Sequence, residues 1–176
     1  MFLYLAMIDS DADKSKFEIL YSEYKNLMYY TANRILRNSS DAEDVVHQAF
    51  LKVIEILYTI SSPRCHKTRA LLVTITEHKA IDLYREKQRR NVLPLAEEYI
   101  GAAPAEIERL AERDSLAASI ASLPPRYRSV LLLRYDCGYS NAEIANILDT
   151  TEPNVRKLIQ RAKEKLSAQL SGMEEP

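Results

Sequence analysis

Apolar residues recur at steps of three and four along most of this chain, the period of an α-helix with one buried face. The first long run of this kind starts with Phe17, Leu20, Tyr21 and Tyr24. Only 3 of the 176 residues are glycine, and β-branched residues seldom alternate with polar ones as they do in strands. The frequent residues, such as alanine, leucine, glutamate and lysine, favour helix. We therefore expect an all-α protein.

Helix starts are indicated by capping-box spacing, in which a serine precedes a glutamate by three positions. This spacing occurs at Ser15 with Glu18, Ser40 with Glu43, and Ser140 with Glu143. We expect one helix to begin at each serine. Further helices are expected over residues 68–90, 106–122, 126–136 and 152–170, with a polar loop at 61–67.

A segment without sustained periodicity divides the helical parts of the chain. Residues 91–105 contain two prolines and a glycine, as loops do. Residues 91–108 carry four acidic residues and no basic one, whereas both flanking parts have a slight excess of basic residues. We expect a leader at 1–14, an N-terminal helical domain at 15–90, a flexible acidic linker at 91–108 and a C-terminal helical domain at 109–172.

The end of the chain has the spacing of a helix-turn-helix. A short helix from Ser140 is followed by a polar turn at 149–151 and a longer helix at 152–170. Helical spacing places five apolar residues on one face of the longer helix: Val155, Leu158, Ile159, Ala162 and Leu166. The opposite face and its flanks carry Arg156, Lys157, Gln160 and Arg161. Asn154 lies at the N-terminal tip, where recognition helices meet base edges. The pattern predicts DNA binding, and the alternative is a solvated amphipathic helix.

Several segments resemble those of extracytoplasmic-function (ECF) sigma factors, alternative subunits that direct bacterial RNA polymerase to promoters. They are residues 41–46 with 50–53, 123–128 with 131–135, and 143–145 with 155 and 161–162. No single motif is decisive, but together their order and spacing make the match specific. The resemblance implies two small helical domains joined by a flexible linker: a sigma region 2 bundle and a sigma region 4 helix-turn-helix domain. It also implies a mechanism of binding and DNA melting, with catalysis left to the polymerase.

The resemblance assigns three sets of contact residues by position. Core polymerase would be bound by Asp41, Glu43, Asp44, Phe50 and Leu51. The −10 promoter element would be contacted by Arg64, Lys67, Asp82, Arg85 and Arg89. The −35 element would be contacted by Asn154, Arg156, Lys157, Gln160 and Arg161. A flipped base of the opened strand would be held by the 61–67 loop.

Each assignment has a simpler alternative. In the simpler alternative, the acidic residues of 41–44 do no more than stabilise the first turn of a helix, where the dipole favours negative charge. Phe50 is then a core residue. Likewise, the basic residues of 85–90 then do no more than stabilise the C-terminal end of a helix through its dipole. The acidic linker occupies the position of a family segment that threads toward the polymerase's RNA path, and it can equally be a solvated linker.

The chain departs from common family residues at several positions. Leu71 and His78 stand where tryptophan and asparagine are common, and Glu77 stands where arginine is common. Glu77 would put negative charge on a helix expected to approach DNA. Asp149 replaces a usual turn glycine, although aspartate tolerates the left-handed conformation. Pro153–Asn154 replaces a common Gly-Thr pair, so the promoter preference is expected to differ.

No catalytic or metal site is expected. His78 and Asp82 are four residues apart on an expected helix, and Cys65–His66 offers the only other candidate ligands. A catalytic metal needs at least three protein ligands and an open position, and no third ligand is evident. We therefore expect no cofactor and no enzyme activity, and we expect Cys65 and Cys137 to be reduced thiols.

The longest apolar run, Met1–Ile8, is too short to span a bilayer and is followed by acidic residues. Neither membrane insertion nor an export signal is expected, so the expected location is the cytoplasm. The expected partners are core RNA polymerase and promoter DNA. Many ECF sigma factors are held inactive by an anti-sigma protein, and nothing in the sequence identifies one here.

The alternative function is a helix-turn-helix regulator or adaptor that does not itself initiate transcription. Residues 41–53 discriminate between the two functions, because a simple regulator does not need a polymerase-binding segment.

Overall fold

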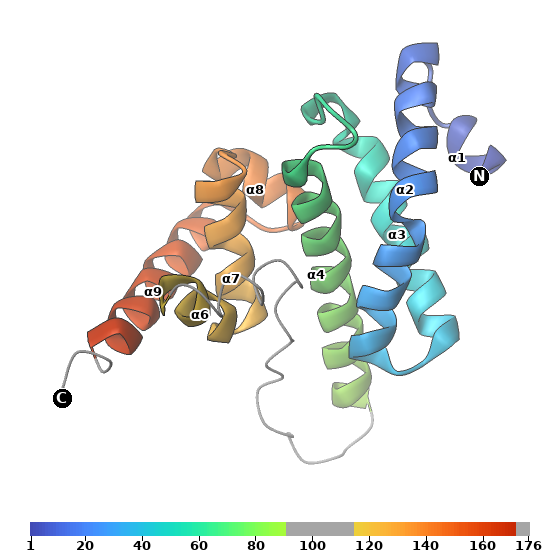
Figure 1. Ribbon diagram of the computed structural model, residues 1–176. Coiled ribbons are helices and arrows are strands. Elements are labelled where there is room, and N and C mark those ends of the chain that lie inside the picture. Colours follow the sequence, from blue (N-terminus) through green and yellow to red (C-terminus); the bar gives the residue numbers. More distant parts are fainter. Residues whose placement is uncertain (91–114, 172–176) are drawn as a thin grey trace. The chain divides into compact units, whose positions relative to one another are not determined.

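The computed structural model describes residues 1–90 and 115–171, which form helices joined by turns and loops (Figure 1). These residues include no strand, which confirms the all-α prediction. The chain forms two compact units, Met1–Leu93 and Pro94–Pro176. The expected linker at 91–108 and the start of the helix expected from residue 106 lie outside the described residues. Within the described ranges, no helix is long and apolar enough to cross a membrane.

Three long helices form the body of the first unit. The helices α2 (Asp11–Leu36), α3 (Ser39–Glu55) and α4 (His66–Arg90) each pack against the other two, and a 3-10 turn, η1 (Leu57–Thr59), follows α3. Their apolar faces meet in a core of side chains with at most 1% exposure: Phe17, Leu20, Met28, Ala49, Phe50, Val53, Leu71, Leu72 and Ile75. Burying one such large side chain contributes about 2 kcal/mol, so this core holds the three helices together.

The first long helix, α2, begins earlier than its capping-box spacing predicted. It starts at Asp11, and its N-cap Ser10 accepts a hydrogen bond from the Asp13 N–H at 3.4 Å. Ser10 has extended backbone, as an N-cap does, whereas Ser15 lies inside the helix. The prediction of a start at Ser15 was therefore wrong, because a cap with acidic residues behind it stands five positions upstream.

The start of α3 is also displaced from its predicted position. A break follows α2, where Arg37 adopts the left-handed conformation with φ 51°. Asn38 is the N-cap of α3, and its side-chain oxygen accepts from the Asp41 N–H at 3.0 Å. The capping box predicted at Ser40 was wrong, because Ser40 is already in the first turn and the asparagine supplies the cap.

The third long helix, α4, is described as far as Arg90 and starts within two residues of the expected position. Leu71, Leu72 and Ile75 of α4 are buried in the core. Glu77 is also buried, with 3% exposure. Glu77 therefore differs from the exposed negative charge that the sequence led us to expect on this helix.

The described part of the second unit contains four α-helices and one π-helical turn. They are α6 (Ser115–Ser122), α7 (Pro125–Leu131), the π-helical turn η2 (Leu132–Asp136), α8 (Asn141–Ile147) and α9 (Glu152–Ser171). Arg128 of α7 is fully buried, and its Nη1 donates to the Ala121 carbonyl of α6 at 3.0 Å. The predicted 126–136 helix is present, with its last five residues in the π-helical turn. Gly138 follows it with φ 78°, a left-handed backbone that glycine adopts readily after a helix.

The capping box predicted at Ser140 is confirmed. The Ser140 hydroxyl accepts from the Glu143 N–H at 3.2 Å, and the Glu143 carboxylate accepts from the Ser140 N–H at 2.8 Å. Hydrogen bonds from the Ser140 side chain and backbone lower the pKa of the Glu143 carboxyl. These bonds fix the start of α8 and therefore the turn that leads to α9.

Replacing Ser140 with alanine is expected to lower the free energy of unfolding of the second unit by about 1 kcal/mol, because the cap is lost. Denaturant unfolding monitored by circular dichroism measures this change. The capped carboxyl has a lowered folded-state pKa, so its contribution is present above the unfolded-state pKa and is lost as pH falls through the folded-state value. The matched control, Ser167→Ala on the exposed side of α9, should unfold like the wild type; an equal loss in both variants would contradict the capping role.

Candidate functional site

The outward face of α9 carries the residues expected to read DNA. Val155 and Ala162 are fully buried on its inner face. The five expected residues, Asn154, Arg156, Lys157, Gln160 and Arg161, are all exposed. The turn before α9 places Asp149 in the left-handed region with φ 49°, as expected for an aspartate in place of glycine. The predicted outer face of α9 is confirmed, whereas on the predicted inner face Leu158, Ile159 and Leu166 are only half-buried. DNA contact stays a prediction.

Hydrogen bonds and ion pairs divide these exposed side chains into two groups. Arg156 pairs with Glu152 one turn earlier, and Gln160 donates to Glu164 at 2.9 Å. Asn154 Nδ2 donates to the Thr150 hydroxyl at 2.8 Å, which holds the asparagine against the turn.

Lys157 and Arg161 form the second group, because they have no partner in the described part of the chain. Both are exposed on the outer face of α9, four residues apart. Nothing in the described residues neutralises these two charges, so they are the most available cations on this face for an anionic partner.

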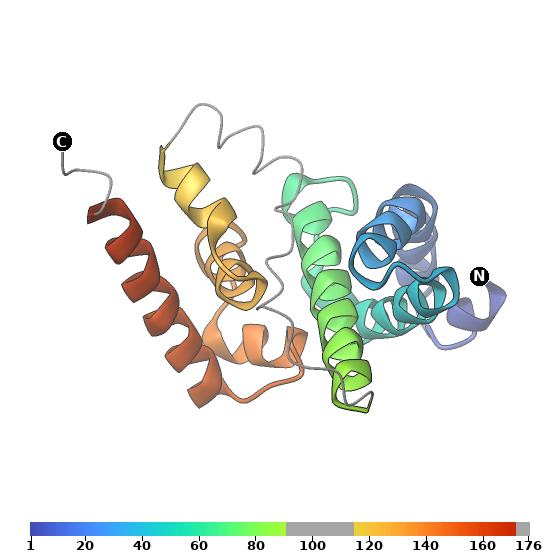
Figure 2. The same cartoon turned by 90° about the horizontal axis from the view of Figure 1, so that it is seen from below.

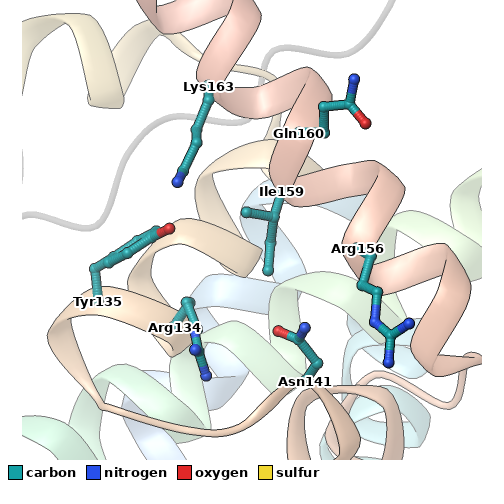
Figure 3. Close-up of a pocket in the computed structure, with 7 residues that line it drawn as sticks. All are labelled: Arg134, Tyr135, Asn141, Arg156, Ile159, Gln160 and Lys163. Carbon is teal, nitrogen blue, oxygen red and sulfur yellow. The ribbon is translucent and has the colours of Figure 1, made fainter.

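A pocket of about 370 Å³ opens beside α9. Figure 3 shows its lining residues, with α9 on one side and residues from η2 and the start of α8 on the other: Arg134, Tyr135, Asn141, Arg156, Ile159, Gln160 and Lys163. Lys163 points toward the ring of Tyr135, with Nζ 5.2 Å from the ring centroid. Arg134 donates to the Tyr139 carbonyl at 3.0 Å. The side-chain oxygen of Asn141 is buried and accepts no hydrogen bond from the described residues. The pocket therefore combines three cations with a free acceptor.

Sequence reasoning did not assign Arg134, Tyr135, Asn141 or Lys163 to a site. Helical spacing offered a signal for Lys163, because it lies seven residues after Arg156 on the same helix. The other three come from segments before α9, and only the tertiary fold brings them to this pocket.

The acidic set predicted on α3 is partly exposed and partly engaged. Glu43 and Asp44 are exposed in the early turns of α3. Asp41 is only 18% exposed at its side chain and forms an ion pair with Lys87 near the end of α4. Leu51 is half-buried. Glu43 and Asp44 are therefore the acidic groups of the set that solvent or a partner reaches.

Phe50 lies in the core of the first unit. Its side chain has 0% exposure, and its ring lies 5.7 Å from Phe17 and 5.0 Å from Tyr21 between centroids. A fully buried ring does not touch a partner unless the bundle opens. We therefore correct its predicted role from polymerase contact to core residue, which was the alternative stated for it.

The residues predicted to face the −10 element lie at the two ends of α4. Asp82, Arg85 and Arg89 share one face near its C-terminal end by helical spacing; Asp82 and Arg89 are exposed, and Arg85 is half-buried. Asp82 lies 3.4 Å from His78 Nδ1. Arg85 and Arg89 have no partner within residues 1–90 and 115–171.

The other two members of this set are Arg64, in the loop before α4, and Lys67, in the first turn of α4, which begins within the expected 61–67 loop. Arg64 and Lys67 are exposed, and Arg64 Nε donates to Glu23 at 3.1 Å. Lys67 and Arg85 are separated by 18 residues of one helix, about 27 Å at 1.5 Å per residue. The structure therefore does not bring the five residues together in one cluster. Arg64 and Lys67 lie at the N-terminal end of α4, and the other three lie near its C-terminal end. Cys65 in this loop hydrogen-bonds Thr68, which lowers the pKa of its thiol.

Among the described residues, no group of three or more histidine, cysteine, aspartate or glutamate side chains is placed to hold a metal ion. His78 Nδ1 and an Asp82 carboxylate oxygen, the pair considered from the sequence, lie 3.4 Å apart within α4.

Comparisons with known proteins match both units to one family. Residues 20–90 match the family described as Sigma-70 region 2, and residues 113–166 match Sigma-70, region 4. The ECF RNA polymerase sigma factor SigL of Mycobacterium tuberculosis is 27% identical over 154 residues, covering 86% of each chain. The ECF RNA polymerase sigma factor SigW of Bacillus subtilis is 26% identical over 178 residues, covering 90% of each.

Among solved structures, the sigma factor RpoE of Bartonella quintana, in complex with the anti-sigma factor NepR, is 16% identical with a TM-score of 0.42, and the match covers 92% of this chain and 97% of that one. The two sigma-70 regions occur in this chain in the same order as the two units of the fold. The chain therefore belongs to the sigma-70 family, as an alternative sigma factor of the extracytoplasmic-function type that directs promoter recognition.

Proposed function

We propose that this chain binds core RNA polymerase through the first unit and contacts promoter DNA with both units. The observation that carries the proposal is the exposed outer face of α9, with Lys157 and Arg161. This helix is the second helix of a helix-turn-helix whose first helix, α8, starts at a capping box. The chain contributes binding and strand opening in this proposal, and the chemistry of RNA synthesis belongs to the polymerase. Action in the cytoplasm and control by an anti-sigma protein are part of the same proposal.

Polymerase binding is assigned to α3. Glu43 and Asp44 are exposed carboxylates, and charged groups of this kind favour a partner surface of opposite sign. The half-buried Leu51 lies two turns further along the helix. We therefore propose a partner segment that is basic and partly apolar.

The −35 contact is assigned to α9 and the pocket beside it. Asn154 is at the N-terminal end of the second helix, the part that approaches base edges in helix-turn-helix proteins. Lys157 and Arg161 suit phosphates, because such contacts position the protein on the duplex. The pocket supplies further cations, Arg134 and Lys163, on the same side of α9 as Arg156.

The −10 contact is assigned to the edge of α4. About 27 Å separates Lys67 from Arg85 along the helix, and a DNA strand of several nucleotides spans that length. The loop at 61–67 then meets one end of the opened strand, and Arg85 with Arg89 meets the other. Their charges have no partner among the described residues, so both arginines are available to phosphates.

Replacing Arg85 and Arg89 with alanine is expected to reduce promoter opening about tenfold, since two phosphate contacts are lost, while binding to core polymerase is unchanged. Fluorescence of a base analogue in the −10 element measures opening, on a promoter selected with the wild-type holoenzyme. The control, Lys14→Ala with Lys16→Ala, removes two lysines that pair with Asp11 and Asp13 and should open the promoter normally. Normal opening by the arginine variant would remove α4 from the proposed DNA contact.

A further inference from the structure

Residues 1–10, the part of the expected 1–14 leader that precedes α2, fold onto the groove between α2 and α3. They are called the leader from here on. The leader forms a short helix, α1 (Phe2–Leu5), on the side of α2 and α3 away from α4 (Figure 2). Tyr4 is 8% exposed, and its hydroxyl is 2.7 Å from His47 Nδ1 on α3. Its ring lies 5.4 Å from Phe17 and 5.9 Å from Phe50 between centroids. One buried tyrosine therefore anchors the leader to both helices.

The groove continues beyond Tyr4 as a cavity of about 490 Å³. Tyr21, Lys25 and Tyr29 of α2 line one side, and Glu43 and His47 of α3 line the other. Glu43 is the exposed carboxylate already assigned to polymerase binding. The cavity and the acidic surface of α3 are therefore continuous.

Three other large side chains of the leader are apolar and exposed, whereas Ile8 is buried. Phe2 is 87% exposed, Leu3 is 67% exposed, and Met7 is 54% exposed. Apolar side chains grouped in this way mark interaction sites more often than chance surface. Tyr4 lines the groove, and these three side chains are within three residues of it along the chain.

We propose that α1 and the α2–α3 groove form one docking surface, on which core RNA polymerase seats a helical segment with apolar and basic side chains. The apolar side chains of this segment meet Phe2, Leu3 and Met7, and its basic side chains meet Glu43. This inference rests on the proposed function, because it extends the polymerase contact from α3 to the leader. Continuity with Glu43 favours polymerase over a lipid surface or a second copy of the chain.

The test replaces Phe2 and Leu3 with serine in the full-length chain. Both side chains are exposed, so the thermal unfolding midpoint should not change. Affinity for purified core polymerase should fall about tenfold, as expected when apolar interface anchors are lost. The control, Tyr58→Ser, removes a 74% exposed tyrosine that does not line the groove, and it should bind core polymerase like the wild type.

The possible results separate the two proposals. Normal affinity of the Phe2/Leu3 variant, with binding lost on Glu43→Lys and Asp44→Lys, would overturn the leader's role and leave the α3 contact intact. Tighter binding would also overturn it, since the leader would then cover the site. Loss of self-association or of binding to phosphatidylglycerol vesicles, with polymerase affinity unchanged, would assign the patch to those partners instead. If reversing the α3 carboxylates also leaves affinity unchanged, the proposed polymerase contact itself fails.

Discussion

Replacing Glu43 and Asp44 with lysine is expected to abolish the association of this chain with core RNA polymerase. Both carboxylates are exposed, so the substitution changes a surface charge without opening the core. A partner that is basic where it meets α3 would then face like charge, which costs several kcal/mol at an interface. Copurification with tagged core polymerase, and titration by fluorescence anisotropy, measure the loss.

The control for this experiment is Glu86→Lys, which reverses an exposed carboxylate on α4. It should retain polymerase binding and should unfold at the same denaturant concentration as the wild type. Unchanged binding by the Glu43/Asp44 variant would contradict the α3 contact. The chain would then fit a helix-turn-helix regulator that acts on DNA without bringing polymerase.

The second large effect is expected on DNA binding by the second unit. Replacing Lys157 and Arg161 with alanine should weaken the binding of holoenzyme to promoter DNA at least about tenfold at physiological salt. Each lost phosphate contact also lowers the slope of log affinity against log salt by about one unit, so the slope should flatten by about two. Titrations at four salt concentrations measure both quantities.

The matched control removes two lysines from the first unit, with Lys14→Ala and Lys16→Ala. Those lysines pair with acidic neighbours, and their loss should change neither affinity nor slope. An Arg156→Ala variant gives an internal comparison, because Arg156 pairs with Glu152 and should contribute a smaller salt effect. Equal affinity and equal slope in the Lys157/Arg161 variant and the wild type would reject the outer face of α9 as a phosphate-binding surface.

The sequence predicted the helix-turn-helix well because its determinants are local. The Ser140 cap bonds a residue three positions away, and helical spacing alone separates the buried Val155 from the exposed Lys157. Each of these features depends on neighbours within one or two helical turns.

The helix starts at Ser15 and Ser40 were mispredicted although they obey the same local rule. Capping-box spacing is necessary for the reciprocal bonds but not sufficient, because upstream residues compete for the N-cap position. Ser10 and Asn38 occupy the N-cap positions. Their side-chain oxygens cap a helix about as well as those of Ser15 and Ser40. Choosing among close candidates needs the tertiary packing that fixes where each helix enters the core.

Contacts between distant residues account for the features that the sequence did not indicate. Tyr4 and His47 are 43 positions apart, and Asp41 and Lys87 are 46 apart, so no periodicity links them. The family resemblance predicted a surface charge at Glu77, whereas its side chain is buried. Arg134 enters the pocket beside α9 only after α7 and α9 pack together.

The most direct measurement of the central claim is transcription by purified core polymerase on a library of promoter-length DNA, with and without this chain, with the start sites mapped by sequencing. We predict that a set of start sites sharing one −35 and one −10 sequence arises only when the chain is present. Failure of the chain to associate with core polymerase, together with an unchanged set of start sites, would contradict the account.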